Sequence, residues 1–505
     1  MDPKLFSKTL IRNATWSRSY YTNRNNKVTL YTKISPLGSP SLSVVPELDN
    51  WVQKGKKVRV GELHRIIRDL RKRKRYTHAL EVSEWMKQKG VCIFSATEHA
   101  VQLDLIGRVR GYLEAENYFN DLRDEDKTDK TYGALLNCYV CGRQSDLSLS
   151  HLEKMKELGF ASSALTYNDI MCLYTNLGQC EKVPEVLEEM KENQVLPDNF
   201  SYRICMNSYG KRSDVEGMER VLKEMEGQSH VVMDWNSYAV AANFYIKAGL
   251  TDKATYALKK VEETLDKKDA LGYNNLISLY AKLGNKEEVL RVWTLEKSAC
   301  KRYINRDYMV MLDSLVRLGA IEEAEEVLKE WESSGNCYDF RVPSNLIDGY
   351  SEKGLCGKAE ALLEDLMEKG KSTTPNSWGK VAAGYLEGGE MEKAFKCMKA
   401  AFLVHVEKVG SPAVIDVPLK KSWKPNHEVI NSLLRWLSDT GSVQEVEAFV
   451  GSVKTVIPMS REIYHALLKA RIRGGLEINS LLDAMKTDNV DEDEETINIL
   501  AMKQN

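Results

Sequence analysis

Aromatic residues recur along this chain with a fixed period. Tyrosines come in pairs seven residues apart, and corresponding members of successive pairs advance by 35, 35, 36 and 35 residues: Tyr132/Tyr139, Tyr167/Tyr174, Tyr202/Tyr209, Tyr238/Tyr245 and Tyr273/Tyr280. A seven-residue step returns to nearly the same face of an α-helix, so each pair predicts one helix with an aromatic stripe. The period itself indicates a tandem array of repeats.

Glycines keep the same register and mark the expected end of each of these helices. Five of them are 35 residues apart: Gly249, Gly284, Gly319, Gly354 and Gly389. Glycine readily adopts the left-handed conformation that often follows a helix end. A second amphipathic segment follows, as in 321–335 (IEEAEEVLKEWESSG). The pattern predicts an all-α solenoid of two-helix repeats, each about 35 residues long, in which stacked neighbours complete one another's core.

The register divides the chain into segments. Repeats are expected over residues 60–409 and again over 427–490. Between them, residues 410–426 carry three prolines and break the period, which indicates an inserted loop. Residues 41–59 are expected to be a linker, and the acidic residues 491–505 a frayed tail.

The N-terminus differs from the rest in charge. Residues 1–90 hold 20 Lys and Arg against 7 Asp and Glu, although the whole chain has a formal charge of -2. Residues 1–40 are basic, rich in Ser and Thr, and lack the continuous apolar run of a secretory signal. This favours an organelle transit peptide followed by a disordered N-terminus, mitochondrial rather than plastid. The run from Arg18 to Tyr21 resembles a mitochondrial processing site with cleavage after Tyr20.

Composition narrows the class of protein further. With 43% hydrophobic and 29% charged residues, and without an apolar run near the roughly 18 residues of a membrane span, the chain is expected to be a soluble helical protein. The 10 cysteines show no disulfide framework. Cys138 and Cys141 form one Cys-x-x-Cys motif inside a predicted helix, without a second pair at zinc-finger spacing, so we expect packing positions and no metal site.

The segment 165–198 (LTYNDIMCLYTNLGQCEKVPEVLEEMKENQVLPD) resembles the pentatricopeptide repeat, P class, found in plant organelle proteins. Its period, its Thr-Tyr-Asn opening, its central glycine and its Leu-Pro-Asp ending all match, and the resemblance covers about residues 60–490. It implies a right-handed superhelical solenoid in which each repeat reads about one base of single-stranded RNA. The readers would be the fifth and the last residue of a repeat.

Carried over to this sequence, those positions give a set of candidate base contacts. Asn168 with Asp198 is a pair that the family uses for uracil. The remaining candidates are Arg203 with Asp234, Asn274, Asp339 and Ser344, whereas Ala239, Ile304 and Met309 offer no hydrogen bond to a base edge. The resemblance therefore predicts degraded sequence readout.

Two further features bear on RNA. The second residue of a repeat, an apolar wedge between bases in the family, is apolar at Leu165, Phe200 and Leu271 but polar in other repeats. A basic column eight residues beyond the reader could follow successive phosphates: Lys72, Lys211, Lys247, Lys282 and Arg317. Such cations also suit the end of a helix dipole, so both interpretations stay open. Residues 71–75 form a basic patch for which solvation and nucleic-acid contact are equally consistent.

Two functions follow from these observations. One is an organelle RNA-binding protein acting in mitochondrial transcript processing, stability or translation. The other is a structural subunit associated with the mitochondrial ribosome, favoured by the eroded readers and the mildly acidic body. The sequence lacks a catalytic motif and a cofactor-binding loop, so we expect neither an enzyme nor a bound cofactor.

Overall fold

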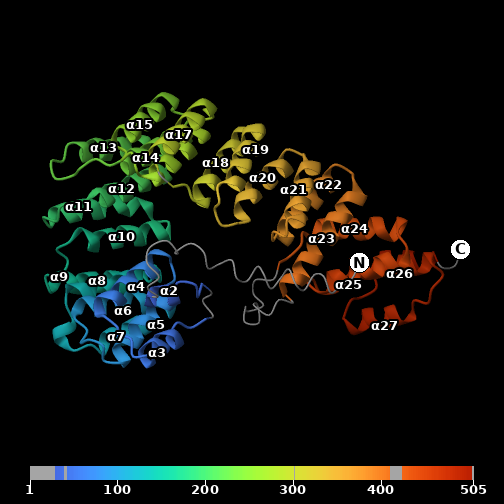
Figure 1. The fold of residues 1–505 in the computed structure, drawn as a ribbon, viewed down its shortest axis with the longest axis horizontal. Coiled ribbons are helices and arrows are strands. Elements are labelled where there is room, and N and C mark those ends of the chain that lie inside the picture. Colours follow the sequence, from blue (N-terminus) through green and yellow to red (C-terminus); the bar gives the residue numbers. More distant parts are fainter. Residues whose placement is uncertain (1–28, 39–41, 301, 410–422, 503–505) are drawn as a thin grey trace. The chain divides into compact units, whose positions relative to one another are not determined.

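Helices make up all the regular secondary structure of the described residues, which confirms the all-α expectation. The computed structural model describes residues 29–38, 42–300, 302–409 and 423–502. It consists of two units, Met1–Ala254 and Thr255–Asn505, and successive helices within each lie side by side in order along the chain (Figure 1). Within the described ranges, the helices are all too short or too polar to cross a membrane.

Among its described residues, the first unit contains six first helices of repeats, five second helices and two short helices, α2 (Leu30–Ile34) and α3 (Val45–Gln53), that precede the repeats. The first helices are α4 (Val60–Lys72), α6 (Ala96–Val109), α8 (Asp129–Cys141), α10 (Ala164–Leu177), α12 (Asn199–Lys211) and α14 (Trp235–Lys247). The second helices are α5 (Tyr76–Gln88), α7 (Tyr112–Asn120), α9 (Ser145–Glu157), α11 (Val183–Glu192) and α13 (Val215–Glu226). Short 3-10 turns, η2 (Asp124–Asp126) and η3 (Cys180–Lys182), lie between some of them.

The second unit continues the same alternation, and the boundary between the units falls inside α15 (Thr251–Thr264). First helices are α16 (Ala270–Lys282), α18 (Asn305–Leu318), α20 (Arg341–Glu352), α22 (Pro375–Glu387), α24 (His427–Thr440) and α26 (Arg461–Arg473). Second helices are α17 (Lys286–Ala299), α19 (Ile321–Ser333), α21 (Cys356–Glu368), α23 (Met391–Val409), α25 (Val443–Lys454) and α27 (Asn479–Thr487).

The periodic glycines lie at or just beyond the ends of first helices. Gly178 and Gly319 are the C-caps of α10 and α18, with φ of 78° and 75°, and Gly249, Gly284 and Gly354 also have positive φ. A residue with a Cβ would be strained at these angles. The chain then turns within a few residues into the second helix, and first helices stack on first helices of the next repeat.

Tyrosines at the second position of these pairs, and at the equivalent position of later repeats, join consecutive helices through shared carboxylates. Tyr350 on α20 donates its hydroxyl to Glu325 on α19 at 2.7 Å, and Lys358 on α21 pairs with the same carboxylate oxygen at 2.9 Å. Tyr385, Glu360 and Lys396 repeat this arrangement one repeat later, and Tyr280, Glu262 and Arg291 do so earlier. Each such joint links three helices, so many acidic residues of the body already have partners within the array.

The segment expected to be a linker is helical instead. Residues 41–59 contain α3 (Val45–Gln53), where Asp49 accepts from the indole of Trp85 on α5 at 2.9 Å. The short helix α2 (Leu30–Ile34) lies in the segment expected to be disordered, and both of its terminal side chains are fully buried. An array needs terminal elements that cover the apolar face of its first repeat, and these helices do so. Within the segment 1–40 that was expected to carry the transit peptide, residues 1–28 and 39–40 lie outside the described residues.

The expected loop 410–426 lies mostly outside the described residues, and the expected tail 491–505 contains a helix. At the end of the expected loop, Trp423 packs on Phe402 of α23 with ring centroids 5.5 Å apart. The tail expected to fray contains α28 (Glu494–Ala501), and the imidazole of His465 on α26 bonds to the buried hydroxyl of Thr496 at 2.8 Å. Residues 494–501 therefore cover the last repeat.

Candidate RNA-binding surface

The last residue of a repeat becomes the N-cap of the first helix that follows. Asp198 precedes α12 and accepts the Ser201 N–H at 2.8 Å, and Asp234 precedes α14 and accepts the Ser237 N–H at 3.0 Å. Aspartate is favoured here because its carboxylate satisfies an amide that the helix leaves free and suits the positive end of the dipole. Helix capping thus fixes both carboxylates in position.

The candidate pair Asn168 and Asp198 is in contact. Asn168 on α10 is 2% exposed and donates from Nδ2 to Asp198 Oδ1 at 3.2 Å. Partial burial opposes ionisation of Asp198, but hydrogen bonds from Ser201 and Asn168 outweigh it and hold the pKa of this carboxyl below its ordinary value. The buried Asn168 Oδ1 has no hydrogen-bond partner within the part of the chain that the structure describes. The carboxylate therefore sets the direction of an amide whose oxygen remains unsatisfied.

The next candidate pair is an ion pair. Arg203 on α12 lies 2.7 Å from Asp234 Oδ2. Partial burial opposes ionisation of Asp234, but hydrogen bonds from Ser237 and the charge of Arg203 lower its pKa below the ordinary value. The two opposite charges offset each other in the free protein, so Arg203 offers less net positive charge to an RNA than an unpaired arginine would.

Asn274 on α16 bonds to a carboxylate, but this carboxylate does not come from the last residue of its repeat. Its Nδ2 donates to Asp307 Oδ1 at 2.7 Å, whereas the last residue of its repeat is the apolar Ile304. Asp307 is the third residue of α18 and also accepts the Ile304 N–H at 2.9 Å. Complete burial, with a smaller contribution from the charge of Asp307, raises the pKa of the nearby Glu296 to about 8.

Among the described residues, the last two base-contact candidates, Asp339 and Ser344, do not bond to the other reader residue of their repeats. Asp339 is bound by Arg341, with Arg341 NH2 at 2.6 Å from Oδ2, and this hydrogen bond lowers its pKa. Ser344 is half-buried on α20. Thr374, the last residue of the same repeat, caps α22 by accepting the Ser377 N–H at 3.2 Å. Across the described residues, no hydrogen bond joins Ser344 to Thr374.

Three apolar side chains stand exposed where first helices begin. Leu165 is 64% exposed, Phe200 46% and Leu271 52%. Each is the second residue of its repeat, three positions before the reader Asn168, Arg203 or Asn274. Single exposed apolar side chains are common on protein surfaces, so the significance of these three lies in their shared position beside the candidate readers.

The basic column lies at the opposite end of the same helices. Lys72, Lys211, Lys247 and Lys282 are the last residues of α4, α12, α14 and α16, and all are exposed, as is Arg317 on α18. Eight residues of helix place them about 12 Å along the axis from the readers. Arg317 Nη2 lies 3.5 Å from Asp313, whose opposite charge partly offsets that of the guanidinium.

The N-terminal basic patch is partly used within the protein. Arg71 pairs with Asp104 on α6 at 2.7 Å, and Arg75 NH1 donates to the Ser35 carbonyl at 3.0 Å. Lys72 and Lys74 remain exposed beside them. The patch therefore holds the first repeat to its neighbours and leaves fewer cations for a nucleic acid than its sequence suggests.

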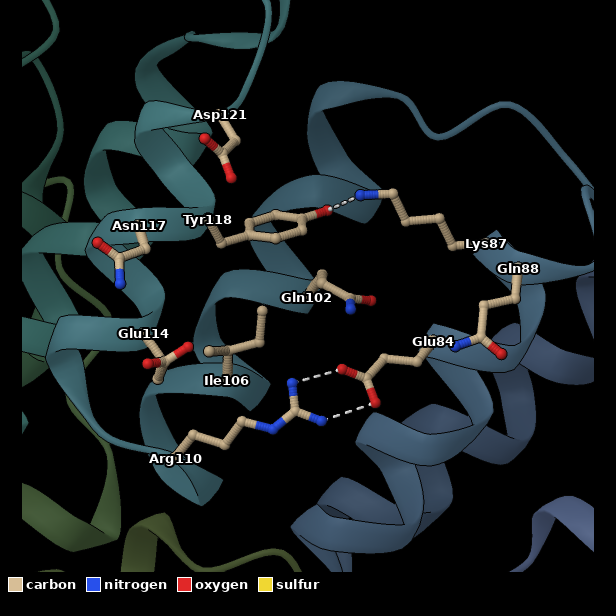
Figure 2. Close-up of a pocket in the computed structure, with 10 residues that line it drawn as sticks. All are labelled: Glu84, Lys87, Gln88, Gln102, Ile106, Arg110, Glu114, Asn117, Tyr118 and Asp121. Atoms are coloured by element: carbon tan, nitrogen blue, oxygen red, sulfur yellow. Dashed lines mark hydrogen bonds and ion pairs between the residues drawn. The ribbon is translucent and has the colours of Figure 1, made fainter.

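A polar cavity of about 440 Å³ lies between α5, α6 and α7 (Figure 2). Two ion-pair contacts join Arg110 to Glu84, the shorter at 2.7 Å, and Lys87 donates to the Tyr118 hydroxyl at 3.4 Å. Its lining comes mostly from the second helices α5 and α7. Because these charged groups bond to one another, the cavity is a joint between repeats and does not extend the surface of the readers.

Only the first cysteine of the Cys-x-x-Cys motif is buried in the core, whereas Cys141 is exposed. Cys138 is buried on α8 with its Sγ 3.5 Å from the Leu103 carbonyl, and burial raises its pKa to about 12. Cys141 lies one turn further on, with its Sγ 3.6 Å from Asn137 Oδ1. Among the described residues, no group of three or more His, Cys, Asp or Glu side chains could hold a metal ion.

Comparison with known proteins matches these repeats one by one. The PPR repeat family matches residues 162–211, and the PPR repeat matches residues 130–160, 200–229, 272–294, 307–336 and 343–370. A mitochondrial pentatricopeptide repeat-containing protein of Arabidopsis thaliana is 58% identical over 96% of this chain and 97% of its own length. The chain belongs to the pentatricopeptide repeat family.

Two other members from the same plant, both named as mitochondrial, are 38% and 33% identical over 81% and 88% of this chain, and over 81% and 86% of their own lengths. The location is mitochondrial, as the basic N-terminus predicted. Solved structures of maize PPR10 also match, alone with a TM-score of 0.43 and 18% identity over 95% of this chain and 71% of that chain. In complex with an 18-nt psaJ RNA element, the TM-score is 0.37 and the identity 16%, over 93% of this chain and 80% of that chain.

Sequence reasoning placed Asn168 beside Asp198 but missed Asp307. The family pattern directs attention to the last residue of a repeat, and Asp307 is the third residue of the following one. Asp307 accepts the Ile304 N–H as the acid of a capping box does, although the side chain of Ile304 has no acceptor to complete the box. The available signal was an acid at a position where other repeats carry Thr166, Ser201 or Ser237.

Proposed function

We propose that this chain is a P-class pentatricopeptide repeat protein that binds single-stranded RNA and acts in mitochondrial transcript processing, stability or translation. The observation that carries this proposal is the contact of Asn168 with Asp198, flanked by the exposed side chains of Leu165 and Phe200.

The chemistry of that contact suits a base. A buried acceptor without a donor costs about 1–3 kcal/mol, so Asn168 Oδ1 gains from any group that brings an N–H. Uracil and guanine carry a ring N–H on the Watson–Crick edge, whereas cytosine and adenine carry a ring acceptor there. Family resemblance favours uracil. Leu165 and Phe200, which are one repeat apart, could pack against the two faces of that base.

A structural role in the mitochondrial ribosome is the alternative, and two observations favour it. Arg203 is neutralised by Asp234, and the apolar Ala239 and Met309 stand at reader positions. An array with few working readers could hold ribosomal RNA or proteins through its shape.

Crosslinking in isolated mitochondria, followed by sequencing of the bound RNA and sedimentation of the extract, separates these functions. A discrete footprint on one or a few transcripts supports the proposal. Cofractionation with a ribosomal subunit, with crosslinks confined to ribosomal RNA, would refute it in favour of the alternative.

The second test addresses the pair itself. On a transcript identified in this way, Asn168→Ala should weaken binding about three- to tenfold when the site contains the matching uracil, because one hydrogen bond is lost. Asn193→Ala serves as the control, since Asn193 is an exposed residue just beyond α11 whose amide donates to the Glu189 carbonyl at 2.9 Å. Equal affinities for the wild type and Asn168→Ala would contradict the proposed reading position.

A further inference from the structure

Two asparagines at reader positions share the same hydrogen-bonding state although only one has the expected partner. Asn168 donates to Asp198, the last residue of its own repeat, and Asn274 donates to Asp307. In both, the amide oxygen is buried and has no hydrogen-bond partner among the described residues. The repeat of Asn274 thus has the chemistry of the Asn168 repeat, with its carboxylate supplied from a different position.

Asn274 is held more completely than Asn168. Its Nδ2 donates both to Asp307 Oδ1 at 2.7 Å and to the Ala270 carbonyl at 2.8 Å, so both amide hydrogens are used. A carboxylate and a carbonyl can only accept, which fixes the amide with its nitrogen toward them. The single group left to meet a ligand is the acceptor Oδ1.

Asp307 organises the surroundings as well. It is 1% exposed, accepts the Ile304 N–H through Oδ2, and accepts from Arg306 NH2 through Oδ1 at 3.2 Å. The guanidinium of Arg306 is half-exposed and stands one repeat after the exposed Leu271. A base over this site would lie between an aliphatic side chain and a planar cation, both of which pack well against a ring.

We infer that Asp307 is a positioning residue that makes Asn274 a reader of a base with a ring N–H, uracil or guanine, in the RNA that binds this chain. This inference rests on the proposed function and extends it to a repeat that the family pattern counts as degraded. Counted along the sequence at one base per repeat, the base lies three nucleotides from the one at Asn168.

The test starts from the full-length chain and a pool of random single-stranded RNA, from which bound sequences are selected. Affinities are then measured for four RNAs that differ only at the nucleotide three positions from the uracil that depends on Asn168. The wild type should bind RNAs with uracil or guanine there about three- to tenfold more tightly than those with cytosine or adenine.

Substitutions then separate positioning from mere stability. Asp307→Asn should abolish the preference at this nucleotide and leave the uracil at Asn168 unaffected, because an amide no longer forces Asn274 Nδ2 toward it. The double variant Ile304→Asp, Asp307→Asn returns a carboxylate to the place that Asp198 holds in its repeat, and should restore the preference. Asp313→Asn, the same change at an exposed site on α18, should leave the preference intact.

Folding is checked by circular dichroism, and Asn274→Ala provides a second variant that keeps the Asp307 cap and should also lose the preference. If the wild type selects uracil at the nucleotide read by Asn168 but binds the four test RNAs with equal affinity, this inference is wrong and the proposed function still stands. An Asp307→Asn variant that lowers affinity for all four RNAs equally would also overturn this inference. Failure of the wild type to select any sequence would instead refute the proposed function.

Discussion

Replacement of the buried Glu296 by glutamine should stabilise the protein, and more so as the pH rises. Glu296 on α17 is fully buried, and neither of its carboxyl oxygens has a hydrogen-bond partner in the described chain. Burial, together with the charge of Asp307, raises its pKa from 4.5 to about 8. Between these values the unfolded chain has released a proton that the folded chain keeps, so this group makes stability fall as pH rises.

The size of the effect follows from the same pKa values. One pKa unit corresponds to about 1.4 kcal/mol, so the cost of keeping Glu296 folded grows to about 5 kcal/mol above pH 8. That figure is a ceiling, since side chains rearrange around a buried charge. Glutamine has nearly the same shape and does not titrate. The advantage of Glu296→Gln over the wild type should therefore stay under about 1 kcal/mol at pH 5 and reach several kcal/mol at pH 8.5.

Thermal and urea unfolding of both proteins, followed by circular dichroism from pH 5 to 8.5, measures this difference directly. Glu287→Gln, an exposed change on the same helix, is the matched control and should give a difference that hardly varies with pH. Parallel stability curves for Glu296→Gln and the wild type would show that Glu296 is not kept neutral in the folded protein.

Three further substitutions test the joints, the helix packing and the basic column. Tyr350→Phe removes the hydrogen bond to Glu325 and should lower the free energy of unfolding by about 1 kcal/mol in urea titrations. Gly349→Ala places a methyl group 2.5 Å from Val316 Cγ1, where the first helices α18 and α20 pack, and should cost about 1–3 kcal/mol in the same assay. Lys211→Gln should weaken binding to a verified RNA whatever its sequence, and lower the slope of log affinity against log salt by about 0.7.

Each of these three substitutions has a matched control substitution elsewhere in the chain. Tyr256→Phe, at an exposed ring on α15, should leave stability unchanged. Gly451→Ala, within α25 and without an atom within 4 Å of the added methyl group, should stabilise by about 0.5–1 kcal/mol. Lys329→Gln, at an exposed position on the second helix α19, should leave the salt slope unchanged. Equal effects in test and control would contradict the structural assignment concerned.

The repeats were predictable from sequence because the same residues return at the same interval for the same physical reason. The glycine at position 319 predicted a turn, because glycine readily adopts positive φ, and its φ is 75° in the structure. The terminal helices α3 and α28 were not predictable in this way. They are short, have no copy elsewhere in the chain, and are held by tertiary contacts that a repeat pattern does not reveal, such as those of Asp49 with Trp85 and Lys89.

The candidate surface divides along similar lines. The approach of Asp198 to Asn168 follows from a repeat ending that is also a helix cap, so motif and geometry agree. The approach of Asp307 to Asn274 depends on which of two nearby backbone positions carries the acid, and only the packed helices reveal it. The neutralisation of Arg203 by Asp234 likewise needs coordinates.

The tyrosine–carboxylate joints have a consequence for how such a protein can change its length. Glu325 and Glu360 occupy equivalent places 35 residues apart, as do Tyr350 and Tyr385. Excision of residues 340–374 would bring Tyr385 to the carboxylate that Tyr350 leaves, so the severed ends would rejoin with matching chemistry. Loss or gain of a whole repeat would therefore leave these joints intact, and under the proposed function the RNA footprint would change by one nucleotide for each repeat.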